Sequence, residues 1–276
     1  MDFSSASEWL NLLLRWLHVF SAILWIGSTW LFTWMDGWFT SGAAAPGTGA
    51  NSGFAPIWMV HSGGFYRVEK VKDPGHMPAT LHWFKWEAAA TFASGFLLLG
   101  VVYFWGGGVL LDSDVSGLGL GAATALSLGV LAAGWFVYDG LMISPLGRSE
   151  VGAGAVGVAL LFAVAWSLLH LLSARAAYLE VGALMGTLMA LNVWVRILPS
   201  QRRMVAALKA GRPPDSAEGD RAKRRSKQNS FMGVPTVMLM LSNHFPVATY
   251  GNDHAFLVLC GLVLVGMGAA KILRSH

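Results

Sequence analysis

The sequence predicts an all-α membrane protein, a polytopic helix bundle in which about seven helices cross the bilayer. Hydrophobic residues make up 55% of its 276 residues and charged residues only 12%. Soluble domains carry about 25% charged residues, so a soluble globular protein is excluded. The chain also contains 13 tryptophans, and indole rings gather at the two interfaces of a bilayer.

Seven stretches have the roughly 20 predominantly apolar residues that a membrane-spanning helix requires. We expect them to form a single integral-membrane domain over residues 1–276. The first stretch is long enough to tilt or to project beyond the hydrocarbon. The predicted spans are residues 9–38, 83–105, 119–145, 153–173, 177–199, 230–248 and 255–272.

Basic residues gather in the loops on one side of these spans. The loop 200–229 alone contains nine lysines and arginines, and short cytoplasmic loops are enriched in both residues. We therefore predict that loops 41–82 and 200–229 are cytoplasmic and that the N-terminus lies outside. The same asymmetry accounts for the pI near 9.4, and we expect no nucleic acid partner.

The first cytoplasmic loop is too aromatic in its middle to be a plain linker. Residues 57–66 read Ile-Trp-Met-Val-His-Ser-Gly-Gly-Phe-Tyr, and we expect this segment to fold back against the helix ends. The loops on the opposite side contain one basic residue, Arg175, and several acids. They predict an acidic outer face formed by Asp112, Asp114, Glu180 and Asp253.

Three histidines fall at similar depth in the outer halves of three different spans. A single histidine of this kind is more often a hydrogen-bonded core residue than a ligand. Histidines on facing helices, however, are the usual axial ligands of a b-type heme. The sequence has one cysteine, Cys260, so the C-x-x-C-H motif of a covalent c-type heme is absent. We expect heme b, with iron bound by any two of His18, His170 and His244.

A second polar group lies toward the predicted cytoplasmic side, and the motif Leu81-His-Trp-Phe-Lys-Trp-Glu-Ala88 is its densest part. Charged groups at the start of a membrane helix are costly unless they meet water, a partner or a ligand. Trp83, Lys85 and Trp86 also suit an interfacial belt, which explains Glu87 poorly. The group is either the pocket of a small polar substrate or a set of ion pairs that holds helix ends together. Its members are Asp36, His82, Lys85, Glu87, Asp139, Asn192, Arg225 and Asn229.

Motifs spread over nearly the whole chain resemble the membrane domain of the bacterial cytochrome-c-linked urate oxidases, also called urate hydroxylases. They include the Leu81–Ala88 motif together with Leu14-Arg-Trp-Leu-His18, Trp25-Ile-Gly27, Trp34-Met-Asp36, Gly134-Trp-Phe-Val-Tyr-Asp139, Ser144-Pro-Leu-Gly147, Pro199-Ser-Gln-Arg202, Arg225-Ser-Lys-Gln-Asn229 and Ser242-Asn-His-Phe-Pro246. The resemblance implies a multi-pass protein of the bacterial cytoplasmic (inner) membrane. It also implies oxidation of urate to 5-hydroxyisourate, with electrons passed to cytochrome c.

The sequence departs from this family in two places. Full-length members continue into a C-terminal cytochrome c domain, whereas this sequence stops at His276. We therefore expect an external cytochrome c or a separate redox subunit as the electron acceptor. The loop reads His61-Ser-Gly-Gly64, where the family more often has three glycines after the histidine.

If the substrate is urate or a related heterocycle, the chemistry of the inner polar group suggests a role for each of its members. Lys85 and Arg225 would attract the urate anion, and Glu87 with His82 would accept a proton. Asp36 and Asp139 complete the catalytic candidates, and Asn192, Asn229 and His61 complete the substrate-binding candidates. The alternative function is a non-catalytic heme-binding or structural subunit of a larger respiratory or photosynthetic membrane complex.

Overall fold

The computed structural model describes residues 3–40, 55–71, 74, 77–105 and 109–275, with side chains from residue 6 onward. Much of the predicted cytoplasmic loop, namely residues 41–54, 72–73 and 75–76, lies outside this part. The α-helices are α1 (Phe3–Thr40), α2 (Trp86–Leu99), α3 (Leu120–Ile143), α4 (Glu150–Leu169), α5 (Ala174–Leu191), α6 (Leu198–Lys209), α7 (Ser216–Leu241) and α8 (Ala255–Ser275). Between them lie two π-helical segments, η1 (Gly100–Phe104) and η3 (Asn192–Ile197), and two short 3₁₀ turns, η2 (Pro145–Arg148) and η4 (Ser242–His244).

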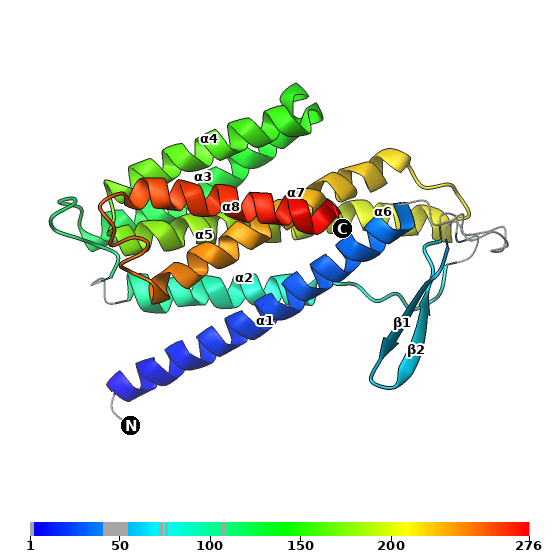
Figure 1. Cartoon of the computed structure of the whole chain (residues 1–276), viewed down its shortest axis with the longest axis horizontal. Coiled ribbons are helices and arrows are strands. Elements are labelled where there is room, and N and C mark those ends of the chain that lie inside the picture. The colour runs from blue at the N-terminus through cyan, green and yellow to red at the C-terminus, as the bar shows by residue number, and fades with distance from the viewer. Residues whose placement is uncertain (1–2, 41–54, 72–73, 75–76, 106–108, 276) are drawn as a thin grey trace.

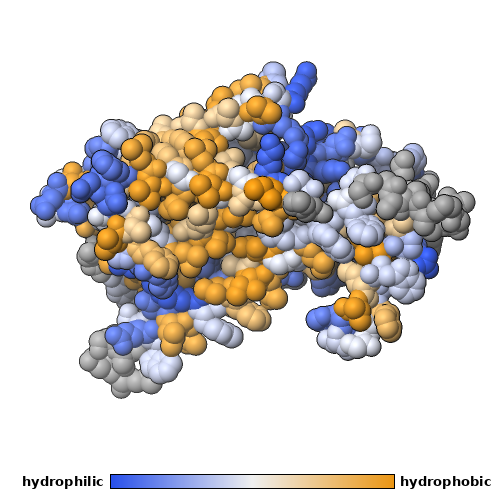
Figure 2. All heavy atoms as spheres, viewed as in Figure 1, coloured by the Kyte–Doolittle hydropathy of each residue, from blue (hydrophilic) through white to orange (hydrophobic). Residues whose placement is uncertain are grey.

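The predicted fold class is confirmed, because six helical segments of the described chain are long and apolar enough to cross a membrane. Figure 2 shows a band of apolar side chains across the middle of the molecule, with polar side chains toward both ends. The six segments are Ala6–Thr40, Trp86–Phe104, Leu120–Ile143, Glu150–Leu169, Ala174–Lys209 and Ala255–Ser275.

The predicted span 230–248 is not one of these six segments. The structure instead contains α7, a helix that begins at Ser216 and ends at Leu241. Its first half carries the charged residues of the basic loop, so only its second half is apolar. Figure 1 shows that α7 nevertheless runs between the same two ends of the bundle as α8. The helix count therefore agrees with about seven crossings, while the boundaries of this one were wrong.

The helices define two ends of the bundle. At one of them, here called the N-terminal end, α1 begins, α4 ends and α8 begins. At the other, here called the α6 end, α1 ends, α2 begins and α6 lies (Figure 1). The described parts of loops 41–82 and 200–229, both predicted to be cytoplasmic, lie at the α6 end, which is the arrangement that alternating spans require.

Helix α5 is the central helix of the bundle and packs against α2, α3, α4 and α7. Small residues on its neighbours permit this close packing. A Cβ atom added at Gly134 of α3 would collide with Leu184 of α5. Between α7 and α8, a Cβ at Gly266 would lie 2.8 Å from the backbone of Pro235. These glycines let the helix backbones approach each other, as small residues do in membrane bundles.

The aromatic middle of the first loop forms an antiparallel hairpin of β1 (Ile57–His61) and β2 (Gly64–Val68). Ser62 and Gly63 form its two-residue turn, both at positive φ (50° and 77°), as hairpin turns of the primed types require. One face of the hairpin packs through Ile57 on Met35 and Phe39 of α1. The loop therefore folds back against a helix end, as expected. Its other face leaves three large apolar side chains exposed, those of Trp58, Val60 and Phe65.

Candidate functional site

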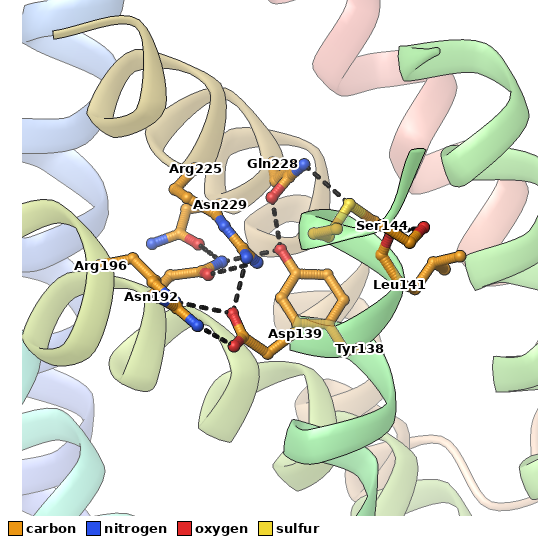
Figure 3. Close-up of polar contacts among 10 residues, drawn as sticks. Tyr138, Asp139, Leu141, Ser144, Asn192, Arg196, Arg225, Gln228 and Asn229 are labelled. Atoms are coloured by element: carbon orange, nitrogen blue, oxygen red, sulfur yellow. Dashed lines mark hydrogen bonds and ion pairs between the residues drawn. The ribbon is translucent and has the colours of Figure 1, made fainter. Parts of the chain in front are cut away.

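A buried polar network joins α3, η3 and α7 near the α6 end. The network contains four of the predicted inner residues, namely Asp139, Asn192, Arg225 and Asn229, which are 8%, 0%, 6% and 7% exposed. Asp139 is the last of five buried α3 residues spaced four apart, beginning at Ala123, a spacing that puts side chains on one helix face. The predicted convergence of these four side chains is confirmed (Figure 3).

Asp139 accepts hydrogen bonds from two arginines. Arg225 Nη2 donates to Asp139 Oδ1 over 2.6 Å. Arg196 donates from Nε to the same oxygen over 2.9 Å and from Nη2 to Oδ2. Such a two-pronged contact between guanidinium and carboxylate is among the stronger polar interactions in proteins. One carboxylate thus holds η3 and α7 against the end of α3.

Asn192 connects the remaining members of the network. Its amide nitrogen donates to Tyr138 Oη over 2.9 Å and to Asn229 Oδ1 over 2.8 Å, and its oxygen accepts from Arg225 Nη1 over 3.2 Å. Asn229 in turn donates to the Met189 carbonyl over 3.0 Å. With this, every polar atom of the Asn192 side chain is paired, as buried polar groups generally are.

Three members of the network were missed in the sequence. Tyr138 donates to Gln228 Oε1 over 2.6 Å, and its ring lies 5.2 Å from the guanidinium carbon of Arg225. Arg196 is the third. A charged arginine inside the predicted span 177–199 costs enough free energy to indicate that it has a polar partner. Arg196 also lies four residues after Asn192, a spacing that puts both side chains on one helix face. That signal was present in the sequence.

The hydrogen bonds and the net charge of this network determine what it can do chemically. Its hydrogen bonds are satisfied among its own members, so for these residues the ion-pair interpretation applies rather than that of an open pocket. It also contains two arginines and one aspartate, and therefore carries excess positive charge. The Arg196 side chain remains 39% exposed, so this charge reaches the surface next to the network.

The start of α2 approaches η3 from another side. Lys85 Nζ lies 4.9 Å from the ring centre of Trp86 and 6.0 Å from that of Trp194, and the two indoles meet edge to face at 6.0 Å. Trp194 belongs to the same π segment as Asn192 and Arg196. Segments of this kind occur frequently at functional sites. The structure therefore places Lys85 against η3, without a direct contact to the Asp139 network among the described residues.

The other predicted inner residues lie apart from the network. Glu87 is half-buried and forms no side-chain hydrogen bond or ion pair within the described chain. His82 is exposed and its ring meets Phe84 edge to face at 4.6 Å. Asp36 pairs instead with Lys70 and, over 3.7 Å, with Lys223. His61 is exposed beside the hairpin turn.

Of the three predicted heme ligands, His18 has the most suitable surroundings. It is half-buried, and its Nδ1 lies 2.9 Å from the Thr91 carbonyl. Only a protonated Nδ1 can donate to a carbonyl, so in the neutral ring Nε2 keeps the lone pair that a metal ion would need. A metal-bound histidine usually donates its other ring N–H in this way. A Cβ at Gly95 would lie 2.8 Å from the His18 ring, so this glycine makes room for the imidazole.

The other two histidines lie at helix ends. His170 is exposed, with Nδ1 2.8 Å from the Trp166 carbonyl, and His244 is exposed in η4. No contact among the described residues joins the three rings to one another. His18 therefore fits an axial ligand, while the choice of its companion stays a prediction. Glu180, predicted on the acidic outer face, is instead 2% exposed and bonded to Ser127 of α3.

Fold and site together define a multi-pass membrane helix bundle with a buried, positively charged network near one end. The model of the urate oxidase N-terminal family matches residues 4–275, and the chain belongs to this family. It is therefore a urate oxidase-like membrane protein, as the sequence motifs predicted. No curated protein and no solved structure matches the chain.

Proposed function

We propose that this protein oxidises urate, or a closely related heterocycle, in the bacterial cytoplasmic membrane and passes the electrons to a cytochrome c. In the balanced reaction, urate and one water give 5-hydroxyisourate, two protons and two electrons. Two ferric cytochrome c molecules take one electron each and become ferrous. The protein would have to bind an anion, accept protons and deliver electrons.

The observation that carries this proposal is the positively charged network of Asp139, Arg196 and Arg225 near the start of α2. Urate is an anion at neutral pH, and the exposed part of Arg196 and the Lys85 ammonium both offer donors. Lys85 stands over two indole rings, and flat aromatic surfaces suit a planar heterocycle. We assign Lys85 and Arg196 to substrate binding and Arg225, Asn192 and Asn229 to holding Arg196 and Asp139 in place.

We assign the role of proton acceptor to Glu87. It lies in the first turn of α2, two residues after Lys85, and no cation among the described residues neutralises it. A carboxylate free of such a partner is available to accept a proton from a bound substrate. His82, which is exposed, would pass the proton on to water.

Electron delivery requires a carrier between the substrate site and the acceptor. A b-type heme bound by His18 and one of the other two histidines would accept and release electrons one at a time. With the N-terminus outside, His18 would lie in the outer half of the membrane, nearer to an external cytochrome c than to the substrate.

The test measures urate-dependent reduction of added cytochrome c by purified protein in vesicles. Glu87→Gln keeps the shape of the side chain but cannot accept the proton, so turnover should fall about 10²-fold or more. Lys85→Met should mainly raise the substrate concentration required, because it removes ground-state binding. Lys227→Met and Glu69→Gln, which remove charges from exposed ion pairs elsewhere, are matched controls and should change neither value.

Wild-type protein that binds heme but reduces no acceptor with urate would overturn the enzymatic proposal. It would support the alternative, a non-catalytic heme-binding subunit, particularly if the protein is recovered only within a larger membrane complex. Equal and modest losses in the Glu87 and Lys85 variants, with poor membrane insertion, would assign these residues a structural role.

A further inference from the structure

The end of α8 carries an arginine that no acid of the described chain neutralises. Arg274 is the second-last residue of α8 and lies at the α6 end of the bundle. It is half-buried, and its Nη1 donates to the uncharged Ser230 hydroxyl of α7 over 3.1 Å. A charged group at the end of a membrane helix is costly unless it meets water, a partner or a ligand. The Arg274 guanidinium is therefore available to an anion from outside the described chain.

Two residues of α7 hold Arg274 in a defined orientation. Ser230, which accepts its hydrogen bond, is only 2% exposed, and the ring centre of Phe231 lies 5.9 Å from the guanidinium carbon. No described residue accepts a hydrogen bond from Nε or Nη2, so both nitrogens remain as donors. A guanidinium presents its donors in a planar fork that matches two oxygens of a phosphate group. Arg274 is thus oriented for a ligand of this kind.

Positive charge exceeds negative charge around Ser230. Lys271 is exposed and lies three residues before Arg274 on α8, a spacing at which side chains are neighbours on a helix. No acid of the described chain forms an ion pair with Lys271. Lys227 lies three residues before Ser230 on α7 and pairs with Glu150 of α4 over 2.6 Å. Three cations against one acid leave two positive charges uncompensated, those of Lys271 and Arg274.

Apolar side chains lie directly beside these charges. Ile272 and Leu273 stand between the two cations of α8, and Val151 follows Glu150 at the start of α4; all three are exposed. Figure 2 shows hydrophilic side chains over the first half of α7 where they border the apolar band, and Figure 1 shows that α4 and α8 diverge toward the α6 end. A ligand at this place meets cations and apolar surface together. A phospholipid, with its phosphate above its acyl chains, has the matching distribution.

We propose that Arg274 and Lys271 bind the phosphate of an anionic phospholipid in the leaflet at the α6 end, and that Ser230 and Phe231 hold Arg274 in place. Basic residues between membrane helices on the cytoplasmic side bind anionic headgroups in this manner, and the basic loops of this chain lie at the same end. Free phosphate offers the same oxygens without acyl chains, so the exposed apolar residues beside the cations favour the lipid. The lipid site goes beyond the proposed oxidation, which uses none of these residues.

The experiment uses full-length protein, purified in detergent and freed of lipid, and measures lipid retention by native mass spectrometry. Phosphatidylglycerol should be retained several-fold better than phosphatidylcholine, whose headgroup has no net charge. Arg274→Gln should lower the retention of phosphatidylglycerol several-fold, toward that of phosphatidylcholine. Lys271→Gln should lower it less, because a lysine lacks the forked donors of an arginine. Arg212→Gln removes the same kind of charge from the exposed connection between α6 and α7 and should leave retention unchanged.

Ser230→Ala separates the orientation of Arg274 from its charge. It keeps both cations but removes the hydrogen bond to Nη1, so retention of phosphatidylglycerol should fall part of the way toward that of Arg274→Gln. Unchanged retention would overturn the oriented site. Thermal unfolding of each variant distinguishes a loss of lipid binding from a loss of the fold. Lys271→Gln alters an exposed side chain and should unfold as the wild type does, so it tests the site even if another variant folds poorly.

Three results would overturn the lipid site as a whole. The first is equal retention of phosphatidylglycerol and phosphatidylcholine by the wild-type protein. The second is retention of phosphatidylglycerol that does not change in Arg274→Gln. The third is displacement of phosphatidylglycerol by an equal concentration of inorganic phosphate, because the ligand would then be a soluble anion rather than a lipid.

Discussion

Arg225 Nη2 and Asp139 Oδ1 lie 2.6 Å apart in the interior between α7 and α3, where both residues are less than a tenth exposed. Asp139 also pairs with Arg196 of η3. Three segments of the chain therefore depend on one carboxylate. Removal of one partner from a buried pair leaves the other charge uncompensated, which typically costs about 3–5 kcal/mol.

The first prediction compares the stability that is lost when Asp139 is replaced with the stability that is lost when Arg225 is replaced. Asp139→Asn leaves both arginines without a counter-charge and should destabilise the protein by about 3–5 kcal/mol. Arg225→Gln should cost less, because Asp139 keeps its contact with Arg196. Thermal unfolding in detergent measures both variants. Lys227→Ala, which breaks an exposed pair with Glu150, is the control and should change stability by no more than about 1 kcal/mol. Equal losses in Asp139→Asn and Arg225→Gln would contradict the shared-carboxylate arrangement.

The second prediction concerns Glu180, whose only side-chain partner among the described residues is Ser127, over 2.7 Å. Its second oxygen, Oε1, is buried and unpaired. Glu180→Gln preserves shape and one hydrogen bond without introducing a buried charge, so thermal stability should be unchanged or higher. Ser127→Ala should lower it by about 1–3 kcal/mol, because a carboxyl group is then buried without any partner. A marked loss of stability in Glu180→Gln would indicate an ionic partner that the structure does not contain.

The third prediction follows from the contact between α6 and α7. Arg203 holds Glu218 by two hydrogen bonds of 2.8 Å. These bonds, with smaller contributions from Ser200 and Arg221, lower the pKa of Glu218 to about 2. A carboxylate whose pKa is lower in the folded state stabilises the protein above its unfolded pKa, near 4.5. That stabilisation is lost as the pH falls toward 2.

The measurement compares wild type with Glu218→Gln across a pH series. The difference in unfolding temperature should be constant above a pH of about 4.5 and should shrink steadily toward a pH of about 2. A difference that vanishes already near neutral pH would show that Glu218 does not titrate with the lowered pKa.

The fourth prediction concerns the docking of cytochrome c at the N-terminal end. Asp112, Asp114 and Asp253 are exposed there, and acidic surfaces attract basic proteins over a Debye length of about 10 Å at 0.1 M salt. Reduction of a basic cytochrome c should therefore slow as ionic strength rises. Asp114→Asn combined with Asp253→Asn should lower the rate at low salt and flatten this dependence. Glu69→Gln, at the α6 end, is the control.

The side of the membrane on which cytochrome c is reduced provides a separate check on that prediction. In oriented vesicles, the acceptor should be reduced only when it is added on the side of the N-terminus. Reduction solely from the other side would contradict the predicted orientation of the chain. Reduction from the expected side that does not depend on salt would keep the orientation but remove the acidic docking surface.

The sequence predicted most of the helices because apolar length determines what can cross a bilayer. It misplaced α7 because hydropathy cannot detect a helix that continues from a charged half into an apolar half. The π segments, η1 and η3, also escaped prediction. They depend on packing against neighbouring helices rather than on local composition.

The site was predictable in part, for a comparable reason. Asp139, Asn192, Arg225 and Asn229 are polar residues at similar depth in the membrane, and their shared depth was sufficient to group them. Depth does not give direction around a helix, so Asp36, His82 and Glu87 were grouped with them although each of these side chains lies elsewhere. Arg196 was overlooked although its charge inside a predicted span already indicated a partner.

The π segment η3 also bears on which changes of length the chain can tolerate. Deletion of one residue from an α-helix turns everything beyond it by about 100°. In η3 the hydrogen bonds run five residues apart instead of four, so the segment holds a residue that an α-helix would not need. Deletion of Val195, which is 44% exposed, should let η3 close into a regular α-helix. Helix α6 would keep its orientation toward α7, and only the relative placement of Asn192 and Arg196 would change. A shortened chain of this kind should still fold and insert, because Asp139 keeps its contact with Arg225, but it should lose the contact between Arg196 and Asp139.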